Sequence, residues 1–216
     1  MLNFPKSTEY GKKIPKEKFY AKLDISASMK RCFVEDIDQI VWQNKLATST
    51  LNVGNGVNII EIDVLEVSLK KKECSYTVFE FLDKNLPNHT VFVITFANEG
   101  QLLINYKESI ENRVGKHKIT ATYKTDWMPL DHVKLSIEGL NLDKVYESFV
   151  AQIADSKLVI EPHTDIKQAI LESQAKDKLQ KDIIVLESRI KTEKQFNIQV
   201  KLSTKLKELR SNLSKI

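Results

Sequence analysis

The last quarter of the chain is a long segment without a helix breaker, and this feature restricts the fold more than any other. From Thr164 to Ile216 the sequence contains neither proline nor glycine. These two residues are the ones that most often interrupt or end a helix. The segment therefore predicts a long helical region at the end of a chain of 216 residues.

Apolar residues recur in two runs within this segment, with the spacing of a coiled coil. The first run has steps of four, three and four residues and contains Leu179, Ile183, Leu186 and Ile190. The second run has the same alternation and contains Leu202, Leu206, Leu209, Leu213 and Ile216. Such steps place all members of a run on one side of a helix, which we call the seam.

The two runs are out of phase with each other. The step from Ile190 to Leu202 is 12 residues, which is not a whole number of heptads. Residues 193–197, Glu-Lys-Gln-Phe-Asn, lie at this slip. They form either a turn that produces a helical hairpin or a stutter within one helix.

An apolar seam has to be hidden from water, and this requirement predicts association. We expect the seam to bind a second copy of the chain, giving a homodimer, or a helical partner protein. The predicted partner-binding residues are Leu179, Ile183, Leu186, Ile190, Leu202, Leu206, Leu209 and Leu213. The alternative is that the tail folds back and becomes ordinary core.

Upstream of the tail, the sequence predicts an α+β globular domain over residues 1–162, with residues 163–216 as the helical association segment. Strand patterns occur at residues 38–47, 57–69, 90–96, 101–106 and 118–126. Helical patterns occur at residues 15–23, 26–37, 75–85 and 141–154, and residues 1–14 are expected to form a loosely held arm. These elements predict a mostly antiparallel sheet of about five strands with helices on one face.

The sequence also favours a cytoplasmic location. The start of the chain lacks the apolar block of a signal peptide, and no apolar run approaches the ~20 residues that cross a bilayer. Cys32 and Cys74 are the only cysteines. A small secreted protein usually contains more cysteines, in pairs, so we expect both thiols to be reduced.

Positive charge collects at the two ends of the chain. Residues 1–31 contain 8 Lys/Arg and 3 Asp/Glu, whereas residues 32–162 contain 13 and 19. Basic segments of this kind bind nucleic acid or acidic protein surfaces. The candidate nucleic-acid contacts are Lys12, Lys13, Lys16, Lys18, Lys30 and Arg31. The alternative is an ordinary solvated surface, because both signs of charge are mixed along the chain.

One strand pattern contains candidate catalytic residues. Glu61 and Asp63 interrupt the apolar side of the strand at residues 57–69, and Lys45 on the neighbouring strand is placed to pair with them. Two carboxylates and a lysine on adjacent strands are the groups that a divalent-metal nuclease uses. The alternative is an ion pair at the edge of the sheet, which is the commoner arrangement.

No other catalytic or cofactor motif is present. The four histidines, His89, His117, His132 and His163, lack partners at the spacing of a zinc site. No glycine-rich stretch is followed by the Gly-Lys-Ser/Thr of a phosphate loop. The sequence therefore predicts no cofactor and no resident metal, and it favours a protein that is not an enzyme.

Several segments together resemble an uncharacterised bacterial family, the domain of unknown function forty-three ninety-one. The matching segments are residues 14–16, 19–20, 40–42, 45–46, 61–62, 106–108, 125–127, 139–142, 193–197 and 199–200. The resemblance implies a setting near helicases and DNA methyltransferases, and hence an accessory role in a restriction-modification or phage-defence locus. It also implies that an amide commonly occupies the position of Asp63, which weakens the metal interpretation.

Overall fold

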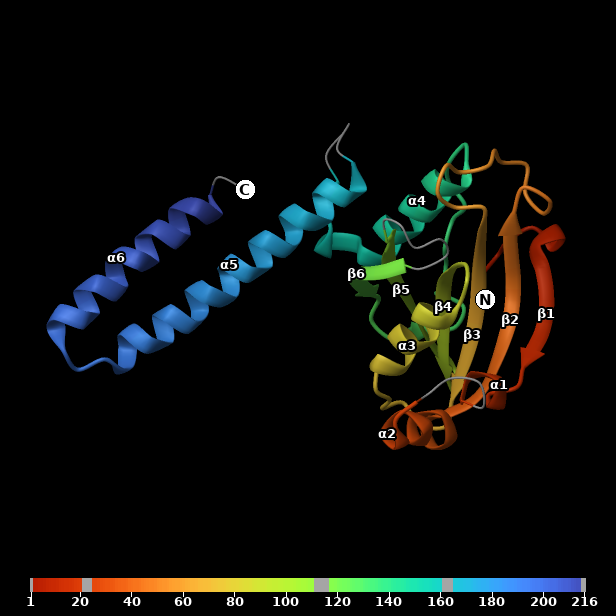
Figure 1. The fold of residues 1–216 in the computed structure, drawn as a ribbon, viewed down its shortest axis with the longest axis horizontal. Coiled ribbons are helices and arrows are strands. Elements are labelled where there is room, and N and C mark those ends of the chain that lie inside the picture. Colours follow the sequence, from red (N-terminus) through yellow and green to blue (C-terminus); the bar gives the residue numbers. More distant parts are fainter. Residues whose placement is uncertain (1, 21–24, 111–116, 161–164, 215–216) are drawn as a thin grey trace. The chain divides into compact units, whose positions relative to one another are not determined.

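The computed structural model describes residues 2–20, 25–110, 117–160 and 165–214. The chain divides into two compact units, Met1–Asp155 and Ser156–Ile216 (Figure 1). The boundary that we expected after Pro162 lies outside the described residues. No described helix is both long enough and apolar enough to span a membrane.

The first unit is built on a mixed sheet of seven strands, not the five that we expected. The strands are β1 (Glu9–Ile14), β2 (Ile37–Ala47), β3 (Glu61–Leu69), β4 (His89–Phe96), β5 (Glu99–Ser109), β6 (His117–Lys124) and β7 (Met128–Pro129). Their order is β1-β2-β3-β4-β5-β6, with β7 on the end of β5. Only β3 and β4 are parallel among these pairs. The fold is therefore α+β with a mostly antiparallel sheet.

Short helices connect and cover these strands. They are α1 (Glu17–Tyr20), α2 (Ala27–Arg31), the π-helical turn η2 (Cys32–Asp36), α3 (Thr77–Asn85) and α4 (Leu142–Ala154), with 3-10 turns η1 (Lys6–Thr8) and η3 (Asp155–Lys157). Helix α3 carries the chain from β3 to the parallel β4, as a parallel pair requires. Ser26 caps α2 by accepting a hydrogen bond from the Met29 N–H at 3.2 Å, and Asn141 caps α4 by accepting one from Lys144 at 3.0 Å.

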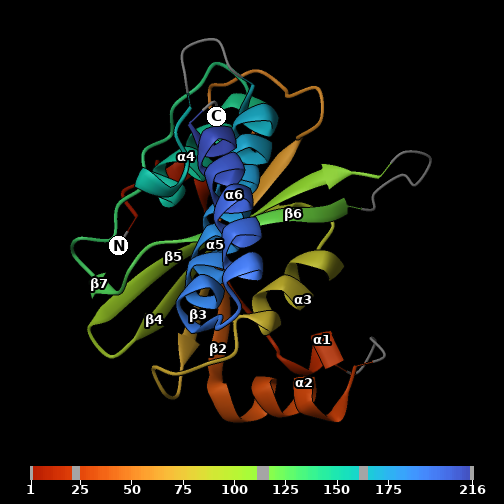
Figure 2. The ribbon, with the colours of Figure 1, turned by 90° about the vertical axis from the view of Figure 1, so that its left-hand side faces the viewer.

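The helices cover both faces of the sheet, so the expectation of helices on one face is wrong. Phe79 of α3 packs on Phe92 of β4 with ring centroids 5.4 Å apart, whereas Tyr146 of α4 packs on His89 at 4.6 Å. Residues 89 and 92 point to opposite faces because side chains alternate along a strand. Figure 2 shows α3 and α4 on opposite sides of the strands.

The face under α3 carries a large apolar core. Its fully buried members include Phe33, Ile40, Val67, Phe79, Leu82, Phe92 and Leu103. They come from α3, η2 and four strands, so this core joins the crossover helix to the centre of the sheet. Burying a large apolar side chain of this kind stabilises the fold by roughly 1.5–3 kcal/mol.

The second unit contains two antiparallel helices, α5 (Ile166–Thr192) and α6 (Phe196–Leu213). They lie side by side in Figure 1, and Arg210 of α6 pairs with Glu187 of α5 at 2.7 Å. The helical tail is thus interrupted at residues 193–195, where Glu193 Oε1 accepts a hydrogen bond from the Gln195 N–H at 2.9 Å. The slip in the apolar spacing corresponds to a turn, and we refer to α5 and α6 together as the hairpin.

Candidate functional site

The structure brings Lys45, Glu61 and Asp63 together on the face of the sheet that carries α3. Glu61 and Asp63 are two residues apart in β3, so both side chains point to this face. Lys45 is the direct cross-strand partner of Asp63 in the β2–β3 register. Its Nζ lies 2.6 Å from Glu61 Oε2. The three residues singled out in the sequence therefore form one cluster.

A fourth residue, Asn88, completes this group, which we call the carboxylate cluster. Asn88 lies in the connection between α3 and β4. Its Nδ2 donates to Glu61 Oε1 at 2.9 Å and to Asp63 Oδ2 at 3.2 Å. No sequence pattern indicated this role, because only the α3 crossover brings Asn88 to the start of β3.

Burial determines the electrostatics of the carboxylate cluster. Asp63 is only 5% exposed, and burial, with a smaller contribution from the neighbouring Glu61 carboxylate, raises the pKa of Asp63 to about 7. Asp63 Oδ1 is buried and accepts no hydrogen bond from the described residues. The hydrogen bond to Glu61 raises the pKa of Lys45, so this lysine carries a positive charge at neutral pH. Two acidic groups thus share a single positive charge, and Asp63 is only partly ionised at neutral pH.

A second charged group lies next to the carboxylate cluster and is entirely buried. Lys107 Nζ lies 2.7 Å from Asp83 Oδ1, and both side chains are 0% exposed. Asn105 Nδ2 donates to the other oxygen of Asp83 at 2.9 Å, and Lys107 also donates to the Asn88 carbonyl oxygen at 2.7 Å. Asn88 therefore connects this buried pair with the carboxylate cluster.

The three histidines that the structure describes do not form a metal site. His89 is the first residue of β4 and is buried, and its ring centroid lies 5.1 Å from that of His117. Burial lowers the pKa of His89 to about 3, with Lys107 contributing in the same direction. In the part of the chain that the structure describes, no group of three or more His, Cys, Asp or Glu could hold a metal ion. His163 lies outside the described residues.

The basic residues of the N-terminal part lie at the other end of the sheet, where β1 ends and α1 and α2 begin (Figure 1). The six candidate nucleic-acid contacts are Lys12 and Lys13 of β1, Lys16, Lys18 of α1, and Lys30 and Arg31 of α2. Lys16 Nζ donates to the Ile37 carbonyl oxygen at 2.7 Å. Strand β2 separates Ile37 from Lys45 by roughly 26 Å at 3.3 Å per residue. Lys16 is thus far from the carboxylate cluster, whereas Lys12 pairs with Trp42, three residues before Lys45 on β2.

The seam residues lie in the hairpin and are only partly covered there. Ile183 is buried, and seven others are half-buried: Leu179, Leu186, Ile190, Leu202, Leu206, Leu209 and Leu213. Ile216 lies outside the described residues. A further apolar set is exposed and was not singled out in the sequence because it departs from the seam spacing; it contains Ile184, Val185, Phe196 and Val200.

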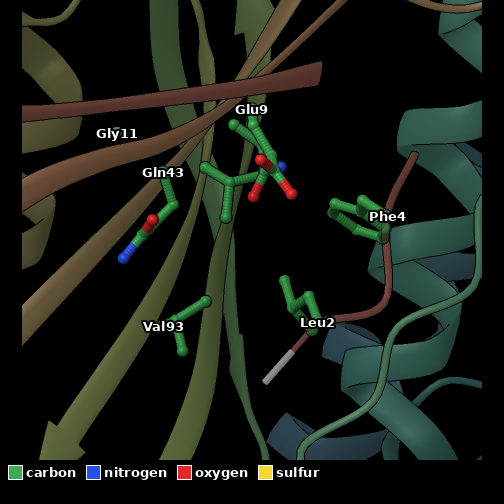
Figure 3. Close-up of a pocket in the computed structure, with 8 residues that line it drawn as sticks. Leu2, Phe4, Glu9, Gly11, Gln43 and Val93 are labelled. Atoms are coloured by element: carbon green, nitrogen blue, oxygen red, sulfur yellow. The ribbon is translucent and has the colours of Figure 1, made fainter. Parts of the chain in front are cut away.

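A small cavity lies on the opposite face of the sheet from α3, beneath the start of the chain (Figure 3). Its volume is about 230 Å³, and it is lined by Leu2, Phe4, Glu9, Gly11, Gln43, Asn44, Val64 and Val93. Ligand pockets usually measure about 300–1,000 Å³. The polar groups that line it include Asn44, whose Nδ2 already donates to Thr8 Oγ1 at 3.0 Å. The cavity is a weaker candidate than the carboxylate cluster or the hairpin.

Comparison with known proteins gives one match. A family model described as "Domain of unknown function (DUF4391)" matches residues 2–213. No curated protein and no solved structure matches the chain. The match extends over both units, so the family model covers the residues of the hairpin as well as those of the sheet.

Proposed function

The chain belongs to the DUF4391 family, and from this premise we propose that it is a non-enzymatic interaction protein that associates through its C-terminal hairpin. The setting implied by the family resemblance is an accessory role beside a helicase or DNA methyltransferase in a restriction-modification or phage-defence locus. That setting follows from the resemblance alone, whereas the contacts of the hairpin support association.

The observation that carries the proposal is the partial burial of the seam. Seven of the eight described seam residues remain half-buried although α5 and α6 pair with each other. Two helices cover a seam from one side only, whereas a bundle of four helices surrounds it. Full burial of a leucine stabilises a fold by roughly 1.5–3 kcal/mol. Completing the burial of each seam residue would therefore contribute on the order of 1 kcal/mol to the free energy of association.

The exposed apolar set supports the same conclusion. Phe196 is 74% exposed, and Val200 lies one turn later on the same side of α6. These two residues and Ile190 line a shallow groove of about 410 Å³, whose other lining residues are Gln199, Ser203, Thr204 and Lys207. Large apolar patches on monomeric proteins are uncommon and usually mark binding surfaces.

The partner that we propose for this surface is a second copy of the chain. Pairing two hairpins produces a four-helix bundle in which the half-buried seams of both copies become the core. Each hairpin supplies the same surface, as a two-fold symmetric dimer requires. A helical segment of another protein is the competing occupant, and the experiment below separates the two.

The test uses the full chain in sedimentation experiments over a wide range of concentrations. The double substitution Val185→Glu/Phe196→Glu alters exposed side chains of the hairpin, so folding is not expected to change. The matched control is Val57→Glu/Leu140→Glu, which changes two exposed apolar residues of the first unit. We expect the wild type and the control to be dimers and the hairpin variant to be a monomer.

Two outcomes contradict the proposal in different ways. A wild type that stays monomeric rules out the second copy, and co-purification with the products of adjacent genes then tests the competing helical partner. A hairpin variant that dimerises as well as the control rules out the hairpin as the contact surface. Circular dichroism of each variant confirms that the helices are intact.

A further inference from the structure

The carboxylate cluster has two acidic groups but only one cationic partner. Glu61 and Asp63 each carry a carboxylate, Lys45 supplies one positive charge, and Asn88 is neutral. Buried carboxylates are stable only when they are paired, hydrogen-bonded or bound to a cation. The described residues thus supply one positive charge for the two acidic groups of this cluster, and burial raises the pKa of Asp63.

A single atom marks where the compensation is missing. Asp63 is 5% exposed, and its Oδ1 accepts no hydrogen bond from the described residues. The other oxygen of Asp63 accepts from the same Asn88 amide group that donates to Glu61, so the two carboxyl groups converge on one place. Buried polar atoms in native proteins nearly always have a partner. An unpartnered carboxylate oxygen beside a second carboxylate points to a bound positive ion.

We propose that Glu61 and Asp63 form a binding site for a divalent cation of the Mg²⁺ or Mn²⁺ class. The site offers oxygen ligands only, and hard cations such as these prefer carboxylate oxygens to nitrogen or sulfur. Mg²⁺ is commonly held by one or two carboxylates while water supplies the remaining ligands. Two carboxylates are therefore sufficient, even though no third acidic group is present in the described part of the cluster.

The cluster is also open enough for an ion to enter. The side chain of Glu61 is 16% exposed and that of Lys45 is 33% exposed, so the cluster reaches solvent on the side of these two residues. Lys45 lies on one oxygen of Glu61 and repels an incoming cation. The lysine therefore lowers the affinity of the site, and its removal gives a test that does not depend on deleting a ligand.

The experiment is calorimetric titration of the full chain with MnCl₂ and, separately, MgCl₂. The near-isosteric substitutions Glu61→Gln and Asp63→Asn each remove one proposed ligand charge. The matched control is Glu66→Gln, on the same strand but on its other face, where Glu66 accepts from Gln43. We expect one ion per wild-type chain, an affinity lower by roughly tenfold or more in the two ligand variants, and no change in the control.

The substitution Lys45→Met provides the independent check. If the ion lies between the carboxylates, loss of the lysine charge strengthens binding. The proposal is overturned if the wild type binds neither ion, or if Glu61→Gln and Asp63→Asn bind as tightly as the control. It is also overturned if Lys45→Met weakens binding as much as the ligand variants do. Thermal unfolding of every variant in the absence of ions verifies that each one is folded.

Discussion

Lys107 of β5 and Asp83 of α3 form an ion pair 2.7 Å long from which solvent is wholly excluded. The pair fixes the crossover helix to a strand that is not its neighbour in sequence. Asn105 Nδ2 donates to the other carboxylate oxygen of Asp83, and the Asn88 carbonyl oxygen accepts a hydrogen bond from Lys107. Burial raises the pKa of the Asp83 carboxyl, and Lys107 and Asn105 act against that rise. The stability of the α3 face therefore depends on both charges being present together.

Removing one charge of this pair is expected to destabilise the protein strongly. Lys107→Met leaves Asp83 buried without its counter-ion and should lower the free energy of unfolding by about 3–5 kcal/mol. The double substitution Asp83→Leu/Lys107→Met should lower the free energy of unfolding by less than Lys107→Met alone. Urea unfolding measures both. Lys84→Met, in an exposed pair with Glu80, is the control and should change stability by about 0.5 kcal/mol or less. A double variant less stable than Lys107→Met would contradict this account.

Asp143 is expected to hold the long β2–β3 loop in place. Its carboxylate accepts hydrogen bonds from the N–H groups of Val57 at 2.7 Å and Ile59 at 2.9 Å, with Asn58 between them. Hydrogen bonds to a charged acceptor contribute about 1.5–3 kcal/mol each at most. Asp143→Ala should therefore speed amide hydrogen exchange at residues 57 and 59 while leaving β4 and β5 protected. Equal protection of these amides in the variant and the wild type would show that the loop is held by other contacts.

The pH dependence of stability should reflect His89. Its folded pKa is about 3, whereas the usual value is 6.5, so the unfolded chain binds a proton at pH values where the folded chain does not. Stability is then fully present above about pH 6.5 and falls as the pH decreases toward 3. His89 is expected to lower the free energy of unfolding by roughly 3–5 kcal/mol over this range, at 1.36 kcal/mol per pKa unit.

The measurement is chemical unfolding of wild type and His89→Phe between these two pH values. His89→Phe should flatten the acid side of the profile, whereas His132→Phe, at an exposed position, should not. An unchanged slope in His89→Phe would mean that other groups cause the acid sensitivity.

Alternation of apolar residues was sufficient to predict the central strands, but not the edges of the sheet. Strands β2 to β5 carry several buried apolar side chains, and β6 alternates Ile119, Ala121 and Tyr123 with polar residues, so each strand could be recognised from its own sequence. Strand β1 has exposed residues on both sides, and its sequence Glu-Tyr-Gly-Lys-Lys-Ile shows no such alternation. Strand β7 has two residues. Both were missed because hydrogen bonding to a neighbour, and not burial, defines them.

The placement of helices and of the candidate site shows a similar division. The apolar side of α4 could be recognised from the spacing of its apolar residues. The sequence of the helix alone does not determine which face of the sheet it covers. Glu61 and Asp63 could be assigned to one face by parity, and the β2–β3 register then brought Lys45 to them. Asn88 could not be found, because its position depends on the path of α3 between two parallel strands.

The pairing of α5 with α6 should depend on the seam and can be separated from the association proposed above. Leu206→Asp places a charge in the half-buried seam of α6. An 18-residue helix that has lost its neighbour is only marginally stable in water. The variant should therefore lose much of the helical signal of α6 in circular dichroism, and proteases should cleave α6 at its lysines. The control Lys205→Asp changes the adjacent exposed residue and should retain both helicity and resistance. If Leu206→Asp also retained them, the seam would not hold the hairpin together, and a four-helix core built from two such seams would have no physical basis.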